Sequence, residues 1–124
     1  DMDSSGITTW AMLQKVYGHD FLIFLQKEPM FAKNDCQKFS YFKLTIKVIG
    51  TATDANSFTY RIEIIGSLGR LLYEDKPKPF VDKEFPNDKQ NDCLIFDENT
   101  AKKISKNGTI PISIRIARCV EICN

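Results

Sequence analysis

The side chains that could do chemistry in this chain are few and stand apart from one another. His19 is the only histidine and precedes Asp20, so this pair could in principle act as a general base. A base of this kind activates a serine or cysteine within hydrogen-bond reach, and sequence spacing does not show such a partner. We therefore predict that His19 is a residue of a turn and that it has no catalytic role.

Asp92 and Asp97 are a second candidate pair, because they flank the apolar run at residues 93–96. A separation of five residues in a strand places two side chains on opposite faces, which argues against shared acid–base chemistry. We predict instead that these aspartates bind neighbouring backbone amides as turn or cap residues.

The four cysteines could hold a metal or form disulfides. Zinc needs four clustered ligands at recognisable spacing, and Cys119 and Cys123 have no histidine or third cysteine near them. We therefore expect no cofactor in this chain. Cys93 lies in an apolar run, where a reduced thiol packs as a small hydrophobic group, and this favours a reducing compartment such as the cytoplasm or nucleus. The fourth cysteine is Cys36.

The bulk composition is that of one folded domain. The 124 residues are 43% hydrophobic and 27% charged, which excludes a disordered tail, and we treat residues 1–124 as a single unit. A net charge of +1 provides no field that would attract nucleic acid or an anionic membrane. The apolar run at residues 21–25 is far too short to span a bilayer. Asp1 is not a natural start, so we expect the chain to be part of a longer protein.

Strict alternation of apolar and polar side chains is the dominant pattern, and it occurs in three separate segments. A period of two places each apolar set on the buried face of a strand and the polar residues on a solvent-exposed face. Half-burial of this kind is typical of antiparallel sheets. The apolar sets are Phe42, Leu44, Ile46 and Val48; Phe58, Tyr60, Ile62 and Ile64; and Ile110, Ile112, Ile114 and Ile116.

Shorter apolar runs bounded by turn residues predict additional strands. Tyr17-Gly18 and the segment from Gly66 to Gly69 are turn candidates, because glycine accepts a positive φ at little cost. Seven to eight short strands with such turns predict an all-β antiparallel sandwich. The additional strands are expected at residues 8–16, 19–26, 70–74 and 93–96.

One short helix is expected around residues 100–105. Asn99 or Thr100 could cap its start, and Asn107-Gly108 could end it with a left-handed residue. Asn107 also begins a glycosylation pattern, which matters only in a secreted protein.

Three other segments are expected to lie outside the strands. Residues 54–56 could form a single helical turn between two strands. Residues 27–38 are polar and irregular and are predicted to form a loop. Residues 75–92 are rich in proline and charge, and a loop of this length in a compact domain is either mobile or functional.

Several short segments of the chain form a recognisable series. They are WAMLQ (10–14), YGH (17–19), FLIFL (21–25), VIGT (48–51), ANSFTYRIE (55–63), GRLLYE (69–74), DCLIFD (92–97) and NG (107–108). In this order they resemble the substrate-binding domain of seven in absentia (Siah-type) ubiquitin ligases. The resemblance runs from about Trp10 to Cys119, which is nearly the whole chain.

This resemblance implies a fold and a role. The fold is the TRAF-like antiparallel β-sandwich of eight strands, usually assembled as a homodimer. In the family a RING finger and two zinc fingers precede this domain and recruit the ubiquitin-conjugating enzyme, so zinc is expected in a region upstream of this chain. By analogy, the chain would select substrate or adaptor proteins and would not transfer ubiquitin alone.

The resemblance also implies a site for extended peptides of the form Pro-x-Ala-x-Val-x-Pro, which lie along an early strand. Backbone hydrogen bonds hold such a ligand, and side-chain pockets select it. Thr8, Thr9 and Ser113 depart from the family, which has valine, aspartate and asparagine at these positions. The matching positions in this sequence are Thr8, Thr9, Trp10, Ala11, Met12 and Ser113.

Alternatives to this interpretation stay open. Trp10 and Met12 could belong to the core instead of a groove. The chain could be an extracellular adhesion or receptor module, which predicts disulfides and a sugar on Asn107. It could also be a scaffold or inhibitor that keeps the fold without a RING partner. An enzyme acting alone is the least favoured class, because no catalytic motif is present.

Overall fold

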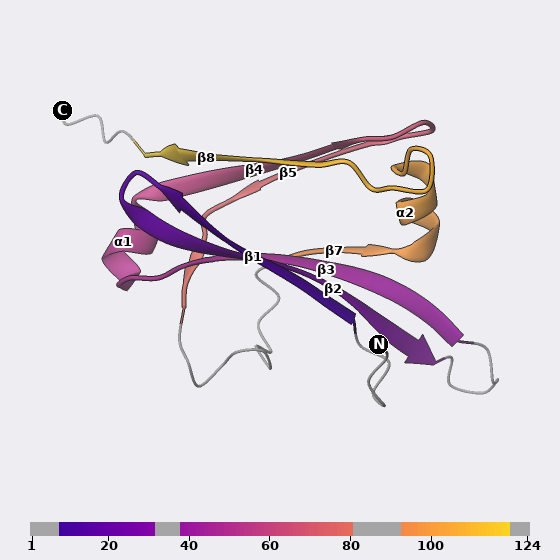
Figure 1. Cartoon of the computed structure of the whole chain (residues 1–124), viewed down its shortest axis with the longest axis horizontal. Helices are drawn as coiled ribbons and strands as arrows, with labels where there is room; N and C mark the ends of the chain where they lie inside the picture. The colour runs from indigo at the N-terminus through magenta and orange to yellow at the C-terminus, as the bar shows by residue number, and fades with distance from the viewer. Residues whose placement is uncertain (1–7, 32–37, 81–92, 120–124) are drawn as a thin grey trace.

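The described residues form eight strands in two sheets that pack face to face (Figure 1). The computed structural model describes residues 8–31, 38–80 and 93–119. One sheet has the order β1-β2-β3-β6, with β7 also paired to β3, and the other has the order β5-β4-β8. The strands are β1 (Thr8–Val16), β2 (His19–Phe31), β3 (Lys38–Val48), β4 (Phe58–Ile65), β5 (Arg70–Asp75), β6 (Lys78–Pro79), β7 (Leu94–Asp97) and β8 (Ile112–Arg118).

This architecture confirms the predicted all-β sandwich. Neighbouring strands run antiparallel with one exception, because β6 pairs in parallel with the end of β3 through Lys47↔Lys78 and Val48↔Pro79. The chain returns from the second sheet to the first at this point, and the sequence pattern did not reveal the short strand.

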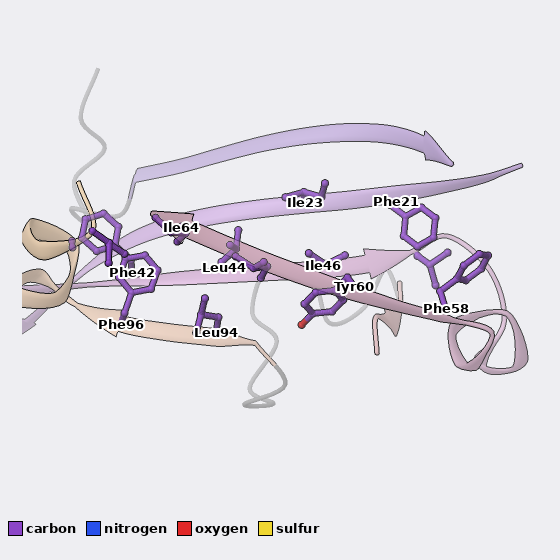
Figure 2. Close-up of a cluster of buried hydrophobic side chains, with 14 of the residues drawn as sticks. Phe21, Ile23, Phe42, Leu44, Ile46, Phe58, Tyr60, Ile64, Leu94 and Phe96 are labelled. Atoms are coloured by element: carbon purple, nitrogen blue, oxygen red, sulfur yellow. The ribbon is translucent and has the colours of Figure 1, made fainter. Parts of the chain in front are cut away.

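The core lies between the inward faces of the two sheets. Figure 2 shows inward side chains of β3, such as Leu44 and Ile46, opposite Tyr60 and Ile64 of β4. Aromatic pairs close both ends, with Phe42 stacked on Phe96 at 5.2 Å between ring centroids and Phe21 packed edge-to-face on Phe58 at 5.1 Å. The apolar side chains predicted to face inward on β3 and on β4 are all buried. The fully buried large residues are Tyr60, Phe21, Phe58, Leu44, Ile46, Ile62, Ile64 and Val48.

The prediction that outward side chains are exposed to solvent holds for one sheet only. On β4 the outward Arg61 and Glu63 stay partly exposed, as the alternation predicts. On β3 the outward Thr45 and Lys47 are buried, with exposed fractions of 8% and 2%. Thr45 lies opposite the buried Phe24 of β2, and β3 has neighbours on both sides, so its outer side chains are more enclosed than those of an edge strand.

Two short helices connect the sheets at opposite ends of the sandwich (Figure 1). Helix α1 (Ala52–Asn56) follows β3 and has a capping box, in which Thr51 and Asp54 each bind the other's backbone N–H. Helix α2 (Glu98–Lys103) follows β7 and is capped by Asp97, whose carboxylate accepts the N–H of Thr100 at 2.7 Å.

These helices correct two expectations. We expected a short helix at residues 100–105 with Asn99 or Thr100 as its cap, but α2 starts earlier because the Asp97 carboxylate caps it. The helical turn expected at residues 54–56 is confirmed, since these residues belong to α1. Asn107 and Gly108 are left-handed, with φ of 55° and 78°. They form a tight turn between Lys106 and Thr109 and do not end the helix, which stops at Ile104.

Element boundaries differ from the expectation in three further places. Residues 27–31, expected to be loop, continue β2, whose pairing with β3 extends to Phe31↔Lys38. Residues 78–79 form β6 inside the expected loop at 75–92. The last strand begins at Ile112, directly after Pro111, because proline has no N–H to donate to a sheet.

The β4–β5 turn rests on the end of α2. The N–H groups of Ser67 and Leu68 donate to the carbonyls of Ser105 and Lys103, each at 3.0 Å. A Cβ atom added at Gly66 would lie 2.2 Å from the backbone carbon of Ile104, so only glycine fits there without a shift.

We predict that Gly66→Ala lowers the free energy of unfolding by about 1–3 kcal/mol, because the new methyl group forces the turn and α2 apart. The matched control is Gly69→Ala, whose added Cβ would lie 3.4 Å from the Cβ of Lys103, an ordinary van der Waals distance. Denaturant unfolding of both variants measures the difference. Equal stabilities for the two variants would contradict the packing argument.

Candidate functional site

The first strand leaves one edge of its sheet open. β1 pairs with β2 along its whole length, from Thr8↔Lys27 to Val16↔His19, and no described strand pairs with its other side. Along that free side, alternate residues present backbone N–H and C=O groups that have no strand partner. An edge of this kind can accept an extended segment of another chain.

The last strand, β8, is an edge of the other sheet, and β1 and β8 lie on the same side of the sandwich. Two adjoining hollows of about 230 and 220 Å³ open between them. Both hollows are lined by Met12, Ile23, Ile112 and Ile114. We call this pair of hollows the seam. Its other lining residues are Trp10, Ala11, Leu25 and Leu44 in one hollow and Gln14, Val16 and Ile116 in the other.

Trp10 and Met12 lie on the inward face of β1, yet neither is buried. They are the register partners of Leu25 and Ile23 of β2, so they extend the apolar inner face of the sheet to its edge. Their exposed fractions are 51% and 54%, because the hollows between β1 and β8 leave these side chains open to solvent. Of the two readings that the sequence left open, groove or core, the exposure favours the groove.

The structure brings only some of the predicted peptide-binding residues together. Trp10, Ala11 and Met12 line the seam, while Thr9 is exposed on β1 and Thr8 begins the strand. Ser113 lies on the opposite face of β8, where it lines a different hollow with Arg61. The alternation of β8 predicted that its isoleucines belong to the core, and Ile112 and Ile114 also line the seam.

The lining of the seam contains no ionisable side chain. Gln14 is its only polar member, so the seam can bind apolar side chains through burial of their surface. Contact of this type selects by shape and size, and each fully buried Val- or Leu-sized side chain contributes roughly 1.5–3 kcal/mol. The arrangement is suited to binding and offers nothing that could activate a nucleophile.

The candidate catalytic residues have structural roles. The Nδ1 of His19 lies 3.3 Å from the Tyr17 carbonyl oxygen, and its Nε2 lies 3.5 Å from the Asp54 carboxylate. The hydrogen bonds that Asp54 accepts from the Thr51 N–H and hydroxyl lower the pKa of its carboxyl group. His19 was predicted to be a turn residue, but it is the first residue of β2, directly after the Tyr17-Gly18 turn, and its contact with Asp54 links this end of the strand to α1.

Asp97 has the capping role that the sequence predicted. The N–H of Thr100 binds its carboxylate and lowers the carboxyl pKa. The cap is therefore strongest when the carboxyl group is ionised, and its contribution to stability is lost as the pH falls through the lowered pKa. Asp92, the other member of the candidate pair, lies outside the described residues.

The part of the chain that the structure describes contains no cluster of metal-ligating side chains and no helix that could span a membrane. No group of three or more His, Cys, Asp or Glu side chains there could hold a metal ion. Cys93 is buried and Cys119 partly exposed, and the two do not form a disulfide with each other, while Cys36 and Cys123 lie outside the described ranges. None of the described helices is long and apolar enough to cross a membrane.

Comparison with known proteins places this sandwich in a family. The family described as "Sina, TRAF-like domain" matches residues 14–115, which is most of the chain. The chain belongs to the Sina TRAF-like domain family. The match begins within β1, just after Trp10 and Met12.

Curated relatives of this TRAF-like domain are ubiquitin ligases. The chain is 31% identical to the E3 ubiquitin-protein ligase sina of Schistosoma mansoni over 118 residues, which is 95% of this chain and 30% of that protein. It is 30% identical to human E3 ubiquitin-protein ligase SIAH2 over 119 residues, covering 96% of this chain and 35% of SIAH2. The E3 ubiquitin-protein ligase sina of Drosophila melanogaster is 28% identical over 117 residues, covering 94% of this chain and 36% of that protein. The TRAF-like domain therefore spans about a third of each relative.

Proposed function

We propose that this TRAF-like domain binds extended segments of substrate or adaptor proteins along the free edge of β1 and thereby brings them to a Siah-type ubiquitin ligase. The observation that carries the proposal is the position of Trp10 and Met12. They are half-exposed on an unpaired strand edge and line an apolar seam.

The binding mode follows from the two parts of the site. The unpaired backbone groups of β1 would form a ladder with the ligand, which is β-augmentation. Alternate ligand side chains would then point into the seam, since successive side chains of a strand face opposite ways. Ordering a short peptide costs entropy, so we expect an affinity on the order of micromolar.

Family membership supports the ligase interpretation over the extracellular module. The RING finger and zinc fingers implied upstream would supply zinc and ubiquitin transfer, and the captured substrate would then be directed to degradation. A scaffold or inhibitor that keeps the fold without a RING finger would use the same seam, and the sequence that precedes this domain in the whole protein distinguishes the two.

We predict that a peptide containing Pro-x-Ala-x-Val-x-Pro changes the fluorescence of Trp10, the only tryptophan, in a saturable way. Met12→Lys should weaken this binding by at least about tenfold, because a charged group would enter the apolar seam. Fluorescence titration of wild type and variant measures both affinities.

Leu13→Lys is the matched control for Met12→Lys. Leu13 neighbours Met12 on β1 and is similarly exposed, at 59%, but its side chain lies on the other face of the sheet. It should retain the wild-type affinity. Equal weakening by both substitutions, or no saturable response in the folded wild type, would count against the seam as the binding site.

Assembly as a homodimer is a second part of the proposal, and it rests on the family. Sedimentation velocity over a range of concentrations tests it, with a dimer expected at high concentration. A species that remains monomeric throughout would reject it.

A further inference from the structure

The outer face of the second sheet carries two arginines directly opposite each other. Arg61 on β4 and Arg115 on β8 are Cα partners in the antiparallel register, and both side chains point away from the core. Like charges at directly opposed positions destabilise a sheet. Either a neighbouring carboxylate or a bound anion would offset this repulsion.

Carboxylates on this face offset the repulsion incompletely. Arg70 donates to Glu63 at 2.9 Å, so that carboxylate is already engaged. The Nε of Arg61 lies 3.6 Å from the Glu74 carboxylate, and this Nε is buried without a hydrogen-bond partner. Arg115 has no ion pair within the described residues, so its guanidinium is available to a ligand.

Two hollows adjoin the arginine pair, and both are lined by Arg61 and Arg115. The larger has a volume of about 460 Å³ and the smaller about 250 Å³. The larger hollow is lined by three positively charged side chains and two carboxylates. The smaller is lined by two positively charged side chains and one carboxylate, so each hollow has an excess of positive charge. The remaining lining residues are Thr59, Tyr60, Glu74, Asp75, Lys76 and Ala117 in the larger hollow and Glu63, Ser113 and Ile114 in the smaller.

We propose that Arg61 and Arg115 together bind a phosphate group on a phosphorylated segment of a partner protein. A phosphate monoester carries nearly two negative charges and three acceptor oxygens, so it can accept hydrogen bonds from two guanidinium groups at once. A carboxylate has one negative charge and two oxygens, so it presents fewer acceptors to the two guanidinium groups than a phosphate monoester does.

The size of the larger hollow favours a phosphorylated side chain over a free ion. Small-molecule sites have volumes of roughly 300–1,000 Å³, and 460 Å³ lies within that range. The phosphate and the residues that carry it can therefore be accommodated together. This surface faces away from the seam, because Arg61 and Arg115 point outward while Ile114 and Ile116 of the same sheet point inward. Ile114 lines both the seam and the smaller hollow, whereas the larger hollow shares no lining residue with the seam.

A pentapeptide with a central phosphoserine, Ac-Gly-Ala-phosphoSer-Ala-Gly-amide, tests the proposal by NMR of the arginine Nε–Hε signals. We expect saturable shifts of the Arg61 and Arg115 signals with this peptide, and far weaker binding of the same peptide with serine or glutamate at its centre. Arg115→Gln should weaken phosphopeptide binding at least about tenfold, because it removes charge-assisted hydrogen bonds to the ligand.

Arg70→Gln is the matched control, since it removes the same charge from the same face at a residue already paired with Glu63. It should change the affinity less than about threefold, because an exposed charge outside the contact is screened by salt. The backbone spectrum and the Trp10 response to the Pro-x-Ala-x-Val-x-Pro peptide report whether each variant is folded. Three results would each overturn the proposal: no saturable shift, equal binding of the glutamate peptide, or equal weakening by both variants.

Discussion

Contact between the inward faces of β3 and β4 holds the two sheets together. Leu44 and Ile46 of β3 and Ile62 of β4 are at most 1% exposed, and each such side chain stabilises the fold by roughly 1.5–3 kcal/mol. Both strands are flanked by neighbours within their own sheets, whereas β1 and β8 lie at the margins. The seam follows from this arrangement, because the inward side chains of the two marginal strands border hollows instead of a close-packed layer and stay partly exposed.

Much of the fold could be predicted from the sequence, because burial on one face imposes a period of two. The ladders of β3 and β4 are buried as expected, and Tyr17-Gly18 forms the expected left-handed turn. The sequence could not show that Lys47 is buried, since a lysine in an alternating pattern normally faces water. It also could not show β6, because two residues carry no periodicity. These features depend on which strands become neighbours, which local pattern does not specify.

The site was less predictable than the fold. The resemblance located Trp10 and Met12, and the structure adds that they are half-exposed and adjoin the isoleucines of β8. Isoleucines at alternate positions look the same in sequence whether a strand is central or marginal, so those of β8 were assigned to the core. Arg61 and Arg115 lie opposite each other because of the register between β4 and β8, two strands that are far apart along the chain. Local sequence pattern does not specify this register. The alternation of the last strand did place Ser113 with Arg115 on its polar face, whereas the resemblance assigned Ser113 to the peptide-binding site.

Amide hydrogen exchange along β1, with and without a saturating Pro-x-Ala-x-Val-x-Pro peptide, tests most directly whether the ligand adds a strand to the free edge. If the ligand pairs with β1, alternate amides between Thr8 and Val16 will become protected, because only every second N–H faces the free side. The amides of β5, the edge strand on the far side of the second sheet, will exchange at unchanged rates. Bound peptide that leaves exchange along β1 unaltered would contradict the account.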